Sequence, residues 1–415
     1  MKTLSLLLFL LSFIAMAQPK DINAEQTAIV SSKHWLDIDY VGDGIVGHRL
    51  DIHLPATGQA PFPIVVAIYG SAWFSNSSKG TVFNTGLGQA LLNNGFAVVS
   101  INHRSSSDAK FPAQIQDVKA AIRFIRANAA KFSMDNSFIG VTGWSSGGHL
   151  TALTGTTNTT QTHSIHGLEV DIEGNLGKYP QTSSKVNAIV DWFGPTDFLI
   201  MDTCGSSFSH NEAKSPESSL VGGAIQDNPD KCALANPISY INAQNPRFLI
   251  FHGNKDPLVP HCQSEKLYEA LQKNKVKSEL IIIPSGGHGP GVMIEKYYEK
   301  MIAFFKEEKG KVKKEQLVER SEADALPLLY PISLQLSPNP ATTETEVAIE
   351  IDSENEGVLT IVDAQGRLFW QQHTSPLPLS SVHPLIRSRP HAGIYFVSFR
   401  SESSVITKRL VIVQP

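Results

Sequence analysis

Continuous apolar runs alternate with segments of helical spacing through the first three-quarters of the chain. The apolar runs are typical of strands buried on both faces of a sheet. They span residues 64–69, 96–101, 137–142, 186–193, 247–252 and 278–283. Segments with apolar positions at helical spacing lie at residues 84–94, 111–131, 264–274 and 291–306. Strands that alternate with helices predict an α/β fold, with a mostly parallel sheet and helices on both faces.

The two ends of this region have different patterns. Residues 35–54 alternate between apolar and polar positions around a Gly-Asp-Gly turn, which predicts a β-hairpin at the edge of the sheet. Beyond residue 332, short alternating strands separated by turn residues predict a small antiparallel β-sandwich. These strands span residues 346–351, 358–362, 367–371, 394–399 and 408–413. The charged segment between the two domains is interpreted as a linker or a frayed helix extension.

The start of the chain has the features of a secretory signal peptide. Lys2 precedes a nearly all-apolar stretch, and Ala15-Met16-Ala17 is a cleavage site of small residues. The apolar stretch is too short to span a bilayer, so we expect an exported protein, secreted or at the cell surface, without a transmembrane anchor. The expected domains are a signal peptide (1–17), an α/β domain (18–306), a charged linker (307–331) and the β-sandwich (332–415).

A candidate nucleophile lies at Gly143-Trp144-Ser145-Ser146-Gly147. An apolar strand precedes this Gly-x-Ser-x-Gly segment and a helix start follows it. In that context the middle serine occupies a tight, strained turn that exposes its hydroxyl above the sheet. The motif alone is a common loop pattern, and its strand–turn–helix surroundings favour the catalytic interpretation of Ser145.

A serine hydroxyl needs a base to remove its proton, and this type of sheet places the acid and then the histidine downstream. Asp256 follows one predicted strand and His288 follows the next, so both lie at carboxyl ends of strands, where ligands bind in open α/β sheets. The sequence therefore predicts a Ser145–Asp256–His288 triad. Asp197 is the alternative acid, and His149 and His252 are interpreted as packing residues.

Small residues follow the first buried strand, where backbone amides could stabilise an oxyanion. We expect the amides of Ser71, Ala72 and Ser146 to be the donors. Tyr69-Gly70-Ser71-Ala72-Trp73 stands where a His-Gly-Gly-Gly-Trp loop is found, so the choice of amides is open. Trp73 and Trp144 are candidate substrate-binding residues.

The three cysteines are expected to form one disulfide in the oxidising compartment that a secreted protein enters. Cys204 and Cys232 bracket an irregular insertion at 201–236 and are the predicted pair, which leaves Cys262 as a free thiol.

A second insertion, residues 154–184, is interpreted as a long loop or small cap. It holds four possible ligands, His163, His166, Glu169 and Asp171, but they lack the spacing of metal sites. No metal or organic cofactor is expected.

Residues 30–306 resemble a secreted α/β-hydrolase of the esterase/lipase branch, and most of all the bifunctional acetylxylan and feruloyl esterases of Bacteroidetes. The matching segments are Phe111-Pro112-Ala113-Gln114-Ile115-Gln116-Asp117, Ala120-Ala121-Ile122-Arg123-Phe124, Gly143-Trp144-Ser145-Ser146-Gly147-Gly148-His149-Leu150, His252-Gly253, Asp256, Val259-Pro260 and Gln263-Ser264. The resemblance implies hydrolysis of acetyl or feruloyl esters on plant polysaccharides. A general short-chain esterase or lipase, a serine peptidase of the prolyl-oligopeptidase kind and a non-catalytic binding protein are the alternatives.

Residues 332–415 resemble the C-terminal sorting domain of the type IX secretion system. The matching segments are Ser337-Pro338-Asn339-Pro340, Ile361-Val362-Asp363, Gly366, Gly393-Ile394-Tyr395-Phe396 and Lys408-Arg409-Leu410-Val411-Ile412. This resemblance implies the secretion machinery as a partner, and a carbohydrate-binding sandwich is the alternative. The net charge of −4 gives no electrostatic reason to expect nucleic acid as a further partner.

Overall fold

The computed structural model describes residues 28–207, 209–325, 333–342, 347–352, 356–374, 381–385, 391–401 and 405–414. The expected signal peptide, residues 1–17, lies outside these ranges. The chain divides into two compact units, one ending at Glu315 and the other beginning at Gln316.

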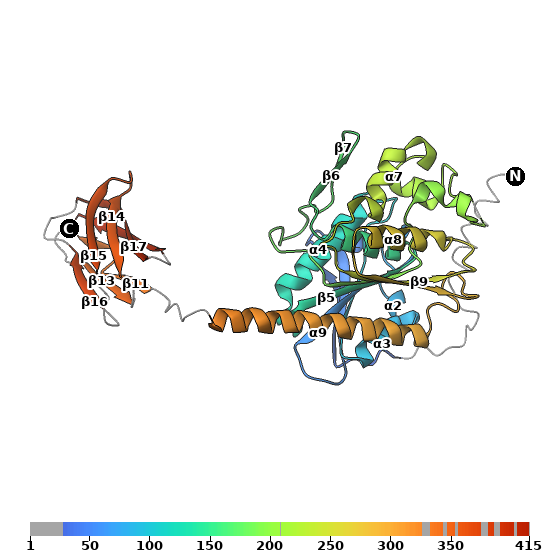
Figure 1. Cartoon of the computed structure of the whole chain (residues 1–415), viewed down its shortest axis with the longest axis horizontal. Helices are drawn as coiled ribbons and strands as arrows, with labels where there is room; N and C mark the ends of the chain where they lie inside the picture. The colour runs from blue at the N-terminus through green and yellow to red at the C-terminus, as the bar shows by residue number, and fades with distance from the viewer. Residues whose placement is uncertain are drawn as a thin grey trace. The chain divides into compact units, whose positions relative to one another are not determined.

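The first unit is built on an eight-stranded sheet with the order β1-β2-β4-β3-β5-β8-β9-β10 (Figure 1). Its strands are Lys33–Asp39 (β1), Arg49–Leu54 (β2), Phe62–Ile68 (β3), Ala97–Ile101 (β4), Met134–Trp144 (β5), Ala188–Trp192 (β8), Arg247–Gly253 (β9) and Ser278–Ile283 (β10). The pairs β1–β2 and β2–β4 are antiparallel and the other pairs are parallel. The predicted edge hairpin and the mostly parallel sheet are both confirmed.

Helices cover both faces of this sheet, as the sequence predicts (Figure 1). The helices are Thr81–Asn84 (α2), Leu87–Asn93 (α3), Ala113–Asn128 (α4), Ser146–Thr156 (α5), Cys262–Lys273 (α8) and Glu295–Ala325 (α9). Strand β3 shows why two layers form, because its alternate side chains enter different apolar clusters. Ile64 and Val66 pack with α4, α5 and α8, whereas Val65 and Ala67 pack with α3 and α9. This two-sided burial explains the continuous apolar runs.

Two helical segments differ from their expected bounds. The helix expected at 84–94 begins only at Leu87, as α3, and a separate short helix, α2, precedes it; Gly86, between the two, has a left-handed φ of 81°. Helix α9 extends to Ala325, so much of the segment interpreted as a charged linker continues this helix. Its described side chains account for part of that extension, since Glu308 forms an ion pair with Arg247 of β9 at 3.0 Å and Val312 packs on the apolar cluster.

The two insertions contain more regular structure than their sequences indicated. Residues 154–184 include a hairpin of Thr162–Ile165 (β6) and Leu168–Asp171 (β7), which projects from the unit in Figure 1. Residues 201–236 include the helices Pro216–Val221 (α6) and Pro229–Ala235 (α7). Each element has only four to seven residues. Segments of this length are too short for a period to be recognised in the sequence.

The second unit contains two small sheets, of orders β11-β13-β16 and β12-β18-β17-β14-β15. Their strands are Ser333–Ser337 (β11), Ala341–Thr342 (β12), Val347–Asp352 (β13), Gly357–Asp363 (β14), Leu368–Thr374 (β15), Ser381–Leu385 (β16), Gly393–Ser401 (β17) and Val405–Val413 (β18). Leu334 of the smaller sheet shares an apolar cluster with Leu359 and Val397 of the larger one, as a sandwich requires. In the parts of the chain that the structure describes, no helix is long and apolar enough to cross a membrane.

Candidate active site

Ser145 lies in a sharp turn between the end of β5 and the start of α5. Its φ of 55° and ψ of −126° are strained for a residue with a side chain, and its amide donates to the Trp192 carbonyl of β8 at 3.0 Å. The flanking glycines are required by close packing. A Cβ on Gly143 would lie 2.5 Å from the Gly147 carbonyl oxygen, and one on Gly147 would lie 2.3 Å from the Ile68 carbonyl oxygen. The Gly-x-Ser-x-Gly spacing therefore sets this turn.

His288 lies in the loop after β10 and connects Ser145 with Asp256. Its Nε2 is 3.0 Å from Ser145 Oγ, and its Nδ1 is 2.7 Å from Asp256 Oδ2. Asp256 comes from the neighbouring loop after β9, so three separate strand ends contribute to the site. The structure thus brings together the three residues that the sequence singled out. In this arrangement an imidazole can remove the serine proton while the carboxylate holds its tautomer.

The Asp256 carboxylate is buried and fully engaged. Its Oδ1 accepts hydrogen bonds from the amides of Leu258 and Val259 at 2.9 and 3.0 Å, and its Oδ2 faces His288. Burial alone would raise the pKa of Asp256, but His288 and His252 outweigh this effect and hold the pKa well below its usual range. Asp256 therefore remains ionised at neutral pH, as the partner of a catalytic histidine should.

His252 lies behind this carboxylate and supports its loop. Its Nε2 donates to the Val259 carbonyl at 2.8 Å and lies 3.5 Å from Asp256 Oδ2, while its Nδ1 is 2.7 Å from Ser264 Oγ. The fully buried side chain fits the packing role expected of it. Sequence reasoning did not anticipate its contact with Asp256.

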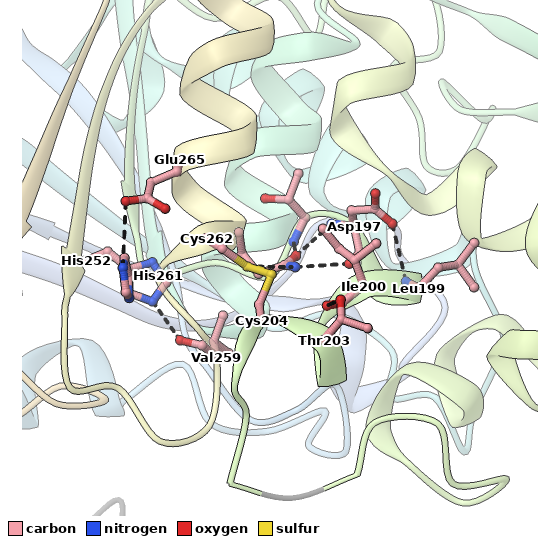
Figure 2. Close-up of a disulfide and its surroundings, with 12 residues drawn as sticks. Asp197, Leu199, Ile200, Thr203, Cys204, His252, Val259, His261, Cys262 and Glu265 are labelled. Carbon is pink, nitrogen blue, oxygen red and sulfur yellow. Dashed lines mark hydrogen bonds and ion pairs between the residues drawn. A yellow bond between two sulfur atoms is a disulfide. The ribbon is translucent and has the colours of Figure 1, made fainter.

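Two other residues raised by the sequence take no direct part in the hydrogen-bonded chain. Asp197, the alternative acid, accepts a hydrogen bond from the Leu199 amide near the disulfide (Figure 2), whereas His288 is paired with Asp256. His149 is buried and donates from Nε2 to the Ala235 carbonyl at 2.8 Å. Burial lowers the pKa of His149 to about 4, so this imidazole is neutral near pH 7.

The loop after β3 meets the serine turn through a hydrogen bond that changes the expected oxyanion donors. The Ser71 amide donates to Ser146 Oγ at 2.8 Å, so the prediction that this amide serves an oxyanion does not fit the structure. Ala72 and Ser146 line the pocket beside Ser145, and their amides remain the predicted donors. Ala72 and Trp73, which follow Ser71 in this loop, adopt left-handed φ values of 51° and 58°.

The pocket beside Ser145 is lined by apolar side chains and by two buried ionisable groups. Its apolar wall includes Trp73, Pro195, Pro216, Leu258 and Val259. The indole of Trp73 is almost entirely buried and packs edge-on against His149 and Phe198, so little of it remains to contact a substrate. Trp144 is partly buried and packs on the apolar cluster of α3 and α9.

The two ionisable groups of this wall are His210 and Glu217, which the sequence reading missed. Both belong to the insertion at 201–236, where no recognised motif marks them. Their only local signal is the Ser215-Pro216-Glu217 helix start, in which Ser215 caps α6 by accepting a hydrogen bond from the Ser218 amide. That signal predicts a helix but gives no information on what the helix faces.

The disulfide prediction is wrong. Cys204 is bonded to Cys262 at the start of α8 (Figure 2), and Cys232 is a buried free thiol. Cys232 lies on α7 and points inward, where its Sγ donates to the Ile225 carbonyl at 3.6 Å. Because the insertion folds into its own helices, proximity in sequence did not predict proximity in space. The bond joins the insertion to the segment that follows the Asp256 loop.

The four possible metal ligands are not gathered into a site. His163 packs against the ring of Tyr240, and His166 forms an exposed ion pair with Asp230 at 2.8 Å. Among the residues that the structure describes, no group of three or more histidine, cysteine, aspartate or glutamate side chains is arranged to hold a metal ion.

Two family models match the chain, one in each unit. Residues 50–271 match the family described as BD-FAE, and residues 335–413 match the family described as the secretion system C-terminal sorting domain. The first match covers Ser145 and Asp256 and ends before His288.

The chain is also similar to solved structures and to curated proteins. A truncated carbohydrate esterase from gut microbiota is 46% identical, with a TM-score of 0.65, over 68% of this chain and 98% of the other. A bifunctional GH43-CE protein of Bacteroides eggerthii is 53% identical, with a TM-score of 0.63, over 66% of this chain and 38% of the other. Esterase LipQ of Mycobacterium tuberculosis is 30% identical over 51% of this chain and 46% of its own length. The chain thus spans about half the length of the curated relatives that it matches.

Proposed function

Because the chain belongs to the BD-FAE family, we propose that it is a secreted serine carboxylic-ester hydrolase that removes acetyl or feruloyl groups from plant polysaccharides. The observation that carries this proposal is the hydrogen-bonded chain from Asp256 through His288 to Ser145 Oγ. The related carbohydrate esterase from gut microbiota and Esterase LipQ support the reaction class.

The proposed reaction proceeds through an acyl-enzyme on Ser145. His288 Nε2 removes the hydroxyl proton as Ser145 Oγ attacks the ester carbonyl, and Asp256 stabilises the resulting imidazolium. The amides of Ala72 and Ser146 stabilise the oxyanion of the tetrahedral intermediate. His288 then gives its proton to the departing alcohol. Water, activated by the same imidazole, attacks the acyl-enzyme and releases the carboxylic acid and Ser145.

The proposal also specifies the substrate class, an acyl group carried by a sugar. The similarity to the carbohydrate esterase from gut microbiota and the resemblance of residues 30–306 support an acylated glycan as the substrate. The wall of the pocket combines apolar residues with the polar pair His210 and Glu217, which suits a small acyl group on a hydroxylated alcohol better than a long lipid chain. We propose that long-chain triglycerides are poor substrates.

The C-terminal unit supports export as the second part of the proposal. Its match to the secretion system C-terminal sorting domain implies delivery by the type IX machinery to the outside or to the cell surface. The sandwich would then act in transport and not in ester hydrolysis.

A panel of five substrates tests the reaction class and its specificity. We expect hydrolysis of nitrophenyl acetate, methyl ferulate and acetylated xylo-oligosaccharide, and little hydrolysis of an emulsified long-chain ester. A proline anilide tests the peptidase alternative, which shares the order of acid and histidine. Turnover of the anilide above the acetyl esters would contradict the esterase proposal, and preference for the emulsified lipid would contradict its specificity.

A further inference from the structure

Glu217 places a buried carboxylate in the wall of the pocket that contains Ser145. Its side chain, in the first turn of α6, is 4% exposed, and the residue lines the pocket together with Ser146 and His288. One carboxylate oxygen, Oε2, forms an ion pair with His210 Nδ1 at 3.0 Å. Oε2 is buried and makes no hydrogen bond beyond this ion pair, and no hydrogen bond to the other oxygen, Oε1, is found within the part of the chain that the structure describes.

His210 fixes the orientation of this carboxylate from behind. Its Nε2 donates to the Leu258 carbonyl at 3.0 Å, and its own amide donates to Asp202 Oδ1. Burial alone would lower the pKa of His210, but the adjacent Glu217 carboxylate outweighs burial and raises it. The ion pair of His210 and Glu217 is held between the insertion and the loop that carries Asp256.

A carboxylate oxygen without a donor is costly in a pocket from which substrate excludes water. A hydroxyl group of the substrate can supply that donor, because a carboxylate accepts hydrogen bonds and cannot give one. An alkyl ester cannot do so, and an anionic group would be repelled. This contrast gives the pocket a basis for selecting hydroxylated substrates.

We propose that Glu217 is a specificity-determining residue whose carboxylate accepts a hydrogen bond from a hydroxyl group of the bound ester, and that His210 is its positioning residue. The inference rests on the proposed esterase function and names the substrate chemistry that this site selects. The hydroxyl belongs either to the sugar that carries the acyl group or to the phenol of a feruloyl group. In both cases a hydroxyl group donates a hydrogen bond to the carboxylate. The two cases differ in which test substrate is hydrolysed more slowly when Glu217 is replaced.

The test compares the full-length protein with its Glu217→Gln variant on four soluble esters. Acetylated xylo-oligosaccharide carries sugar hydroxyls, methyl ferulate carries a phenol, methyl 3,4-dimethoxycinnamate lacks the phenol, and nitrophenyl acetate is the reference without a free hydroxyl. We expect kcat/KM relative to nitrophenyl acetate to fall by about tenfold on the hydroxylated substrate that Glu217 recognises, chiefly through KM, since a charge-assisted hydrogen bond is replaced by a neutral one.

Two variants control for folding and for charge. Glu212 lies on the same insertion and is exposed, so Glu212→Gln removes the same charge outside the pocket and should leave all four rates unchanged. If Glu217→Gln does not fold, Glu217→Asp retains the charge but withdraws the oxygen by one methylene, and it should show the same selective loss. Active-site titration with nitrophenyl acetate corrects each preparation for folded enzyme.

Each possible result leads to a different conclusion about Glu217. A selective loss on the oligosaccharide identifies a sugar hydroxyl, and a loss on ferulate but not on the dimethoxy ester identifies the phenol. An equal loss on all four esters, or no loss, would overturn the proposal, because Glu217 would then have a structural role. If the unmodified protein hydrolysed none of the esters, the proposed function itself would fail before any variant was compared.

Discussion

The Ser71 amide donates a hydrogen bond to Ser146 Oγ at 2.8 Å, and this bond joins the loop after β3 to the serine turn. Ser146 is buried, so its hydroxyl is a fixed acceptor that water does not replace. The bond ties the loop that carries Ala72 to the turn that carries Ser146, and both residues line the pocket beside Ser145. Two predicted oxyanion donors from distant parts of the chain are thereby held together.

Replacing Ser146 by alanine should loosen this junction. The Ser71 amide would be left without its partner at a cost of about 1–3 kcal/mol, and kcat on nitrophenyl acetate should fall by about tenfold or more as the Ala72 amide shifts. Steady-state kinetics and thermal unfolding measure the two effects. Ser71→Ala is the matched control, because it removes a hydroxyl from the same junction and keeps the amide. Equal losses in both variants would contradict this account.

The disulfide between Cys204 and Cys262 should stabilise the fold substantially. The two residues are separated by 58 positions, for which the chain-entropy model gives about 4 kcal/mol. We expect Cys204→Ser to lower the free energy of unfolding by this order. Cys232→Ser tests the free thiol and should retain the disulfide. Peptide mapping without reductant checks the pairing, and a peptide joining Cys204 to Cys232 would refute it.

His149 should make stability depend on pH in the mildly acidic range. Its pKa is about 4 in the folded protein, against the ordinary value of 6.5, so the unfolded chain takes up the proton first. The free energy of unfolding should therefore fall as pH decreases from 6.5 to 4, by up to about 3 kcal/mol from this group.

The measurement for His149 is urea unfolding across that pH range, in the unmodified protein and in His149→Gln. The variant should show a smaller decrease, because glutamine has no proton to gain. His166→Gln, at an exposed side chain, should follow the unmodified protein. An unchanged slope in His149→Gln would show that other groups account for the pH dependence.

The first unit should hydrolyse small esters without the sandwich. Buried residues of α9 such as Met301 and Phe305 belong to this unit, and packing continues as far as Val312. A chain ending at Glu315 should therefore retain kcat/KM on nitrophenyl acetate within about twofold. A chain ending at Lys306 loses Val312 and the ion pair between Arg247 and Glu308, and its thermal midpoint should be lower. If the chain ending at Glu315 did not fold, the sandwich would have a structural role.

The sequence predicted the sheet and the Ser145–Asp256–His288 arrangement because both depend on local signals. Apolar runs identify buried strands, and the carboxyl ends of adjacent parallel strands meet at one edge of a sheet. The glycines around Ser145 are also a local signal, because a side chain at either position would collide with a neighbouring backbone atom.

Other features could not be predicted because they depend on how irregular segments fold back. Cys204 meets Cys262 only after the insertion has formed its short helices, and spacing favoured the wrong partner, Cys232. Glu217 reaches the pocket for the same reason. The Ser71 amide donates to Ser146 Oγ, which lies 75 positions further along the chain, and local sequence does not indicate that contact.

The turnover of Ser145→Ala on nitrophenyl acetate tests the central claim most directly. The substitution removes one hydroxyl from a turn whose shape is set by its glycines, so the thermal midpoint should change little. Loss of the nucleophile should reduce kcat by about four to six orders of magnitude, with similar loss in His288→Ala because the two act as a unit. A folded Ser145→Ala protein that retained near-normal turnover would contradict the account.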